Sequence, residues 1–192
     1  MRLTPSALLR AGGISLAAVV LQLAGLGPAQ FFDATPDLIP LVVAAVALYA
    51  GSVSGAAMGF ATGFLLDLAV GGTMGVSSLV LTAVGYGVGR YREVRDPAHG
   101  LMPIAVGALA TLGFELAFAA VSFMLDVGAT VSPLVFREML VTVALNAIIA
   151  LPVFWACRRI LRPSLAVDPI DKRRRRQGPR EAGPLGLRGL EI

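Results

Sequence analysis

Four ionisable side chains lie within or beside long apolar stretches, where a charge has to serve a purpose. Asp67 follows one apolar run, Glu115 stands near the middle of another, and Arg137 and Glu138 stand near the start of a third. On insertion scales an unpaired charge inside a bilayer costs at least about 2.5–3.5 kcal/mol. Such groups therefore pair with one another, line a path for protons or ions, or reach water.

Glu115 and Arg137 are the most plausible partners. They occupy consecutive apolar segments joined by a short connection, about ten and five residues from it respectively. At 1.5 Å per residue these positions lie roughly 15 Å and half that depth inside the slab. We expect a buried Glu115–Arg137 ion pair, or a polar cluster that includes Asn146. Two roles remain open for this group: fixing the register of the helices, or forming part of a transport path.

The residues needed for catalysis or metal binding are scarce. The chain has one histidine, His99, and one cysteine, Cys157, which leaves no basis for a histidine or cysteine metal site. It lacks the Gly-x-Ser-x-Gly, Walker, His-Glu-x-x-His and Cys-x-x-Cys motifs. Proteolysis by paired aspartates would need a partner for Asp67, and the candidate, Asp126, lies in a predicted loop. We therefore expect no enzyme, no cofactor and no metal.

The stretch 51–75 contains the most distinctive spacing in the chain. Glycines recur at every fourth position: Gly51, Gly55, Gly59 and Gly63. Positions four apart share one face of a helix, and a face without side chains allows another backbone to approach closely within a membrane. A further pair, Gly85 and Gly89, follows in the next apolar segment. The glycine face either packs against that pair or receives the single transmembrane helix of a partner protein.

Composition indicates an integral membrane protein with one domain. Hydrophobic residues make up 56% of the 192 positions and charged residues 15%, whereas soluble proteins average about 25% charged residues. A helix that crosses the hydrocarbon core needs about 20 residues. We predict an all-α domain over residues 1–162 with a break near 50–53, the second segment being marginally short. Its six transmembrane helices are expected at about 7–26, 38–50, 53–70, 76–90, 101–125 and 133–161.

Arginine placement predicts the topology. With six spans, one side of the membrane receives all of the basic residues beside the helix ends: Arg2, Arg10, Arg90, Arg92, Arg95, Arg158, Arg159 and Arg162. The three opposite loops, 27–37, 71–75 and 126–132, contain none. Because basic residues concentrate on the cytoplasmic side, both termini are predicted to be cytoplasmic. A cleaved signal peptide ending near Gly27-Pro28-Ala29 is the alternative for the first segment; an uncleaved helix is favoured because more apolar spans follow.

The segment 163–192 differs from the rest in composition. It is rich in Pro and Gly, has few apolar residues, and contains a basic run of Lys172, Arg173, Arg174, Arg175 and Arg176. We predict a disordered cytoplasmic tail that either fixes topology or attracts anionic lipid headgroups. Nucleic acid is not the expected partner, because the other basic residues stand beside apolar spans.

The order of these features resembles the bacterial rod shape-determining protein MreD family. The resemblance rests on Pro36-Asp37-Leu38 and on ALYAGSVSGAAMGFATGFLLDLAVGGTMGVSSLVLTAVGYGVG over residues 47–89, in which Ala-Leu precedes the first of the spaced glycines. The matching positions are Pro36, Leu38, Gly51, Gly55, Gly59, Phe60, Gly63, Asp67, Gly75, Gly85, Tyr86 and Gly89, followed by Asn146, Pro152 and Arg158-Arg159 in the closing helix. It covers about residues 10–162 and excludes the tail.

This resemblance implies a non-enzymatic scaffold subunit of the cell-elongation machinery in the plasma membrane. The partners it implies are MreC by direct contact and, through the complex, MreB, RodA and a class B penicillin-binding protein. The implied fold is similar to the six-helix substrate-binding S-components of energy-coupling-factor vitamin transporters. An S-component is accordingly the alternative function. The sparse polar and aromatic residues of the predicted external loops, Phe31, Phe32 and Asp33, count against a high-affinity vitamin site.

Overall fold

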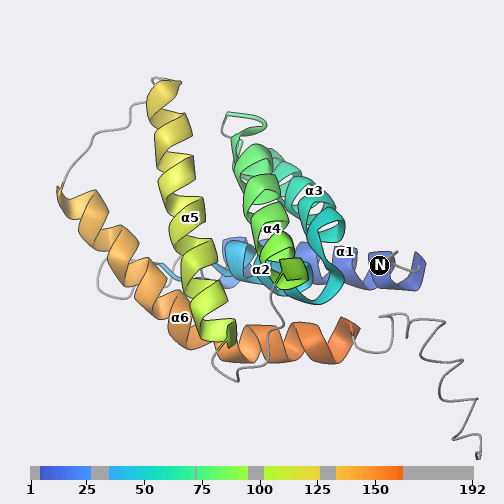
Figure 1. Ribbon diagram of the computed structural model, residues 1–192. Helices are drawn as coiled ribbons and strands as arrows, with labels where there is room; N and C mark the ends of the chain where they lie inside the picture. Colours follow the sequence, from blue (N-terminus) through green and yellow to red (C-terminus); the bar gives the residue numbers. More distant parts are fainter. Residues whose placement is uncertain (1–4, 27–34, 72, 95–101, 126–132, 162–192) are drawn as a thin grey trace, which may run out of the picture.

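Helices make up nearly all of the described part of the chain (Figure 1). The computed structural model describes residues 5–26, 35–71, 73–94, 102–125 and 133–161, and these contain no strand. The helices are α1 (Pro5–Leu21), which continues into a π-helical turn η1 (Gln22–Leu26), then α2 (Leu38–Ala50), α3 (Ser52–Val70), α4 (Val76–Val94), α5 (Met102–Met124) and α6 (Pro133–Leu161). The all-helical prediction is therefore confirmed for these residues.

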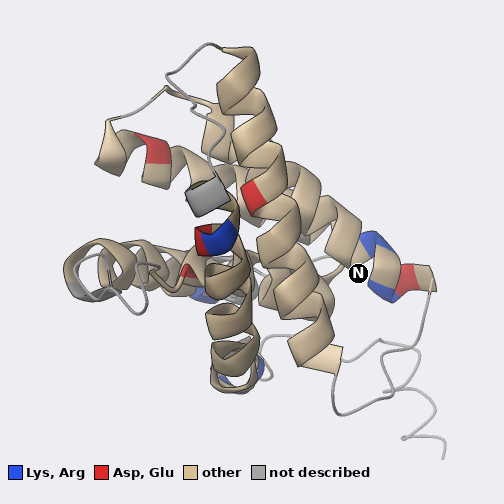
Figure 2. Cartoon of the chain, turned by 90° about the vertical axis from the view of Figure 1, so that its left-hand side faces the viewer, with Lys and Arg blue, Asp and Glu red and all other residues tan. Residues whose placement is uncertain are grey.

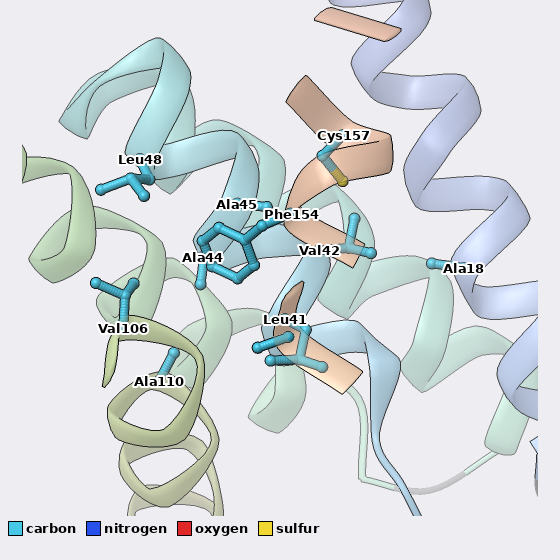
Figure 3. Close-up of a cluster of buried hydrophobic side chains, with 11 residues drawn as sticks. Ala18, Leu41, Val42, Ala44, Ala45, Leu48, Val106, Ala110, Phe154 and Cys157 are labelled. Carbon is cyan, nitrogen blue, oxygen red and sulfur yellow. The ribbon is translucent and has the colours of Figure 1, made fainter. Parts of the chain in front are cut away.

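Helix α2 forms the centre of the bundle. It contacts each of the other five α-helices, and all of its residues are buried except Tyr49, which is half-buried. A helix that is apolar on every side needs such surroundings. In Figure 3, Phe154 of α6 lies against the α2 residues Leu41, Ala44 and Ala45, while Val106 and Ala110 of α5 cover the same cluster from another side. The core is thus built around the segment predicted to be the shortest span.

The predicted break between the second and third segments is confirmed at Gly51. This residue separates α2 from α3 with φ 95° and ψ 178°, a backbone conformation that L-residues with a Cβ atom rarely adopt. The reversal is so tight that Gly51 is at once the last cap of α2 and the first cap of α3.

Only part of the expected six-span arrangement is seen. Three helical segments are both long and apolar enough to cross a membrane: Ser52–Val70, Met102–Met124 and Val135–Leu161. Helix α2, with 13 residues, is about 20 Å long at 1.5 Å per residue, shorter than the roughly 30 Å hydrocarbon core. Helix α4 has 19 residues, but its last turns carry Arg90, Arg92 and Glu93, which lower its hydropathy.

Helix α6 is the longest element and bends along its length (Figure 1). Its 29 residues contain Pro152, which removes a backbone donor and pushes against the preceding turn, so that a kink is expected there. The two halves of α6 therefore point in different directions. The first turns of α6, next to Pro133, lie away from the central helix, whereas the part from Asn146 to Leu161 packs beside α1 and α2.

Contacts group four chain segments at one end of the bundle. Ala11 of α1, Ala50 of α2 and Leu161 of α6 belong to one buried cluster, and the last turns of α4 hydrogen-bond to the α2–α3 hinge. These are the segments that arginine placement predicted to share a side. The predicted tail 163–192 with its basic run, Arg2, Arg95, Arg162, and the loop residues Phe31, Phe32, Asp33 and Asp126 lie outside the described residues.

Candidate functional site

The glycine face of α3 is filled by α4. A Cβ atom built on Gly59 would lie 2.5 Å from the carbonyl carbon of Leu81 and 2.9 Å from the backbone nitrogen of Thr82. A Cβ on Gly63 would lie 2.5 Å from the Cα atom of Ser78. These are backbone atoms that cannot rotate away, so the two helices touch along their main chains at van der Waals distance.

The same contact continues towards the hinge, where glycines of both helices meet. A Cβ on Gly55 would lie 2.5 Å from the carbonyl oxygen of Gly85, and a Cβ on Gly89 would lie 2.7 Å from the carbonyl carbon of Gly51. Of the two alternatives for the glycine face, the structure therefore has packing against Gly85 and Gly89. A partner's helix could reach this face only if α3 and α4 separated, so docking through it is not supported.

Asp67 caps the first turn of α4. Its carboxylate, on the buried side of α3, accepts hydrogen bonds from the backbone N–H groups of Gly75 at 2.8 Å, Ser77 at 3.3 Å and Ser78 at 3.4 Å. The first N–H groups of a helix have no partner within the helix, and a carboxylate there also interacts favourably with the helix dipole. Asp67 thus connects α3 to α4 beyond the glycine face, and its carboxylate stabilises the packing of these two helices.

The opposite end of α4 clamps the hinge between α2 and α3. The Arg92 guanidinium donates to the carbonyl oxygen of Tyr49 at 2.7 Å, in the last turn of α2. The Glu93 carboxylate accepts from the backbone N–H of Ser52 at 3.0 Å and from its hydroxyl at 2.6 Å, at the first residue of α3. A cation thus meets the carbonyl end of one helix, and an anion meets the amide end of the next.

Glu93 is held in its charged form by this arrangement. It lies beyond the apolar part of α4, where its second carboxylate oxygen also accepts from Arg90 at 3.0 Å. The hydrogen bonds from Ser52, helped by Arg90, lower the pKa of the Glu93 carboxyl to about 2. Sequence reasoning assigned Arg90 and Arg92 to topology and overlooked Glu93; the alternating charges of the stretch RYREVR were the available signal.

Asn146 holds the start of the central helix. Its side-chain oxygen accepts from the backbone N–H of Asp37 at 3.0 Å, and its side-chain nitrogen donates to the carbonyl oxygen of Asp37 at 2.7 Å and to the Thr111 hydroxyl at 2.9 Å. The residue is wholly buried. Its amide therefore satisfies both backbone groups of a non-helical residue inside the bundle, as buried polar groups require.

Further hydrogen bonds hold the same segment before α2. Gln22 of η1 accepts from the backbone N–H of Leu38 at 2.9 Å and donates to the carbonyl oxygen of Pro36 at 3.1 Å. The Asp37 carboxylate itself caps α2 by accepting from the N–H of Ile39 at 3.0 Å. Side chains of η1 and α6 thus pair the backbone groups of one non-helical segment inside the bundle, which explains why irregular backbone is tolerated there.

The predicted Glu115–Arg137 ion pair is wrong for this structure. Among the described residues the ion pair is Arg90–Glu93, Arg137 is exposed, and Glu115 is half-buried. Asn146 bonds to Thr111, one turn before Glu115, so the alternative cluster forms without that carboxylate. Helices α5 and α6 diverge towards their connection (Figure 1), and the exposed Arg137 side chain makes no ion pair with Glu115.

Charged residues are sparse over the described helices, as Figure 2 shows. Within the described ranges, no three His, Cys, Asp or Glu side chains are placed so that they could hold a metal ion. The polar groups described above act on the backbone of their own chain. The arrangement is accordingly suited to fixing helices relative to one another.

Comparison with known proteins identifies the family to which the chain belongs. No curated protein and no solved structure matches the chain significantly. The family model of the rod shape-determining protein MreD matches residues 11–160. This range contains the glycine face, the Asp67 cap, the hinge clamp and Asn146, and we conclude that the chain belongs to the MreD family of rod shape-determining membrane proteins.

Proposed function

We propose that this protein is a non-enzymatic scaffold subunit of the cell-elongation complex. In this proposal it crosses the bacterial plasma membrane with six helices and keeps both termini in the cytoplasm. It binds MreC directly and is connected through the complex to MreB, RodA and a class B penicillin-binding protein. Family membership supports a role in shape determination; the topology is inferred from arginine placement, and the partners are those that the resemblance to this family implies.

The observation that carries the proposal is the use made of the buried polar groups. The buried Asp67 and Asn146 and the half-buried Gln22 all hydrogen-bond to backbone groups at or just before the starts of neighbouring helices, and the glycine face holds α3 against α4 by close packing. A rigid bundle built in this way suits a protein that functions by binding partners on its outer surface. A proton relay would instead need such groups to exchange protons with water or with each other.

The docking surface should then lie on an outer face of the bundle. We favour the diverging halves of α5 and α6, where exposed apolar side chains occur on both helices: Leu116, Phe123 and Met124 on α5, with Phe136 and Leu140 on α6. Glu115 stands at the same level, half-buried and outside the ion pairs of the described residues. A partner helix that carries a hydrogen-bond donor at this depth would satisfy the carboxyl group and cover the apolar side chains.

Co-purification with MreC from native membranes tests the proposal. The double variant Phe123→Ala, Phe136→Ala is expected to lose MreC while the protein stays folded, because both side chains are exposed. The matched control is the double variant Phe60→Ala, Phe64→Ala on α3, where both rings are also exposed. This control should recover as much MreC as the wild type.

Three outcomes would contradict parts of the proposal. Equal recovery of MreC with both double variants would show that the α5–α6 surface is not the docking site. Absence of MreC from the wild-type preparation would show that MreC is not a direct partner. A vitamin that raises the melting temperature of the purified protein would favour the S-component alternative, since a ligand that binds only the folded state stabilises it.

A further inference from the structure

The outer face of α6 carries an apolar stripe that ends in arginines. Ile148, Leu151 and Trp155 are 73%, 46% and 63% exposed, and their spacing of three and four residues places them in one row along the helix. Arg158 and Arg159 continue the row in the last turn, and both are exposed. The Arg159 guanidinium lies 5.3 Å from the centre of the Trp155 ring.

A third guanidinium joins them from a distant part of the chain. Arg10 of α1 donates to the carbonyl oxygen of Ile160 at 3.3 Å, so it lies at the carboxyl end of α6. None of Arg10, Arg158 and Arg159 forms an ion pair with an acid among the described residues, where the ion pair is Arg90–Glu93. Within the part of the chain that the structure describes, the end of α6 therefore presents three arginines from two helices and no carboxylate paired with them.

We propose that this end of α6 binds the headgroup of an anionic phospholipid. Guanidinium groups present planar pairs of N–H donors that match the oxygens of a phosphate. Tryptophan favours the level of the headgroups, with its ring towards the hydrocarbon and its N–H towards water. The headgroup phosphate contacts Arg159 with Arg10 or Arg158, and one acyl chain lies along Trp155, Leu151 and Ile148.

The row of apolar side chains decides between a lipid and a free phosphate ion. A phosphate ion would use the arginines alone, whereas a lipid also covers the exposed ring and the aliphatic side chains beyond it. This inference requires that the chain lie in a membrane, and it does not depend on MreC or on the predicted tail.

Trp155 is the only tryptophan of the chain, so its fluorescence reports which lipids touch this face. The full-length protein is reconstituted in vesicles of phosphatidylethanolamine with one-fifth phosphatidylglycerol. In one sample the phosphatidylglycerol is brominated, and in the other an equal amount of phosphatidylethanolamine is brominated. Because bromine quenches only on contact, the ratio of the two quenching efficiencies gives the enrichment of the anionic lipid beside Trp155.

We expect several-fold enrichment for the wild type. Arg159→Gln should lower it by about five-fold, the factor that corresponds to one basic residue at a membrane surface. Arg137→Gln, an exposed arginine at the other end of the same helix, is the matched control and should leave the enrichment unchanged. Millimolar inorganic phosphate should not compete, and replacing Lys172 to Arg176 by Gln should not reduce the enrichment.

The proposal would be overturned by equal quenching from both brominated lipids in the wild type. It would also be overturned if Arg159→Gln and Arg137→Gln behaved alike. Competition by free phosphate would assign the arginines to an ion site, and loss of enrichment only in the tail variant would transfer the lipid contact to residues 172–176. A melting temperature close to that of the wild type confirms that each variant is folded.

Discussion

Replacing Gly85 by alanine should damage the contact between α3 and α4, whereas the same replacement two residues later should not. A Cβ atom at Gly85 would lie 2.7 Å from the carbonyl carbon of Gly55 and even closer to its oxygen. Both are main-chain atoms, which can move only if one helix moves. A Cβ atom at Gly87 would find nothing within 4 Å, although Gly87 stands on the same helix.

The geometry sets the size of the effect. Ordinary van der Waals contacts begin at 3.4 Å, so the helices must separate by at least about 0.7 Å to admit the new methyl group, and forced overpacking of this kind costs typically about 1–3 kcal/mol. Alanine favours a helix over glycine by up to about 1 kcal/mol, but this gain is common to both variants. The difference between Gly87→Ala and Gly85→Ala should therefore be about 1–3 kcal/mol, or five-fold to more than a hundred-fold in the ratio of folded to unfolded protein.

The single cysteine provides the assay. Cys157 is 2% exposed and is the only thiol in the chain, so a fluorogenic maleimide should react with it mainly after unfolding. Purified protein in a mild detergent is titrated with a denaturing detergent, and the midpoint of thiol labelling is compared among the wild type and the two variants. Gly87→Ala should unfold at or above the wild-type midpoint and Gly85→Ala clearly below it.

Equal midpoints for the two variants would refute the reasoning. They would mean that α3 and α4 do not touch at Gly55 and Gly85, and the glycine face would again be available to a partner. A co-purification experiment with Gly59→Leu would then test whether a partner helix binds the glycine face. In that case the variant should lose the partner but remain folded.

Three further predictions concern the polar contacts; the first two use the same thiol assay, and the third follows unfolding by the fluorescence of Trp155, because thiols do not react with maleimides at low pH. Asn146→Ala should lower stability by about 1–3 kcal/mol, because it leaves the backbone groups of Asp37 buried and unpaired; an unchanged midpoint would show that another group or water replaces the amide. Asp67→Ala should cost about 0.5–2 kcal/mol, whereas Asp67→Asn should keep most of the cap; loss of rod shape with a stable Asn variant would instead indicate a role for the charge. Since the pKa of Glu93 is lowered to about 2 from an ordinary 4.5, its stabilising contribution is complete above about pH 4.5 and is lost as the pH falls towards 2. Glu93→Gln should therefore be less stable than the wild type at pH 7 and approach it at low pH; a constant difference would contradict the clamp.

Much of the architecture could be predicted because it depends on local pattern. The apolar runs, the helix break at Gly51 and the spacing of Gly55, Gly59 and Gly63 are visible in the chain, since helix length and periodicity are local properties. Packing of the glycine face against Gly85 and Gly89 was one of two predicted alternatives, because a helix face without side chains can be packed equally well by a helix of the same chain or of a partner protein. Glu115 and Arg137 were paired from their depth and from the short connection between their segments, and neither reveals that α5 and α6 diverge.

The amino-acid sequence by itself determined that this is a helical membrane protein, which segments are apolar, and which residues resemble the MreD family, because composition and periodicity follow from residue type. Only the tertiary structure decided what each polar group touches. Asp67 reaches the start of α4, Glu93 reaches Ser52 across 41 positions, and Asn146 reaches Asp37 across 109. Such contacts depend on the crossing of helices distant in the chain, and the short, almost wholly buried α2 sets those crossings because every other α-helix packs against it.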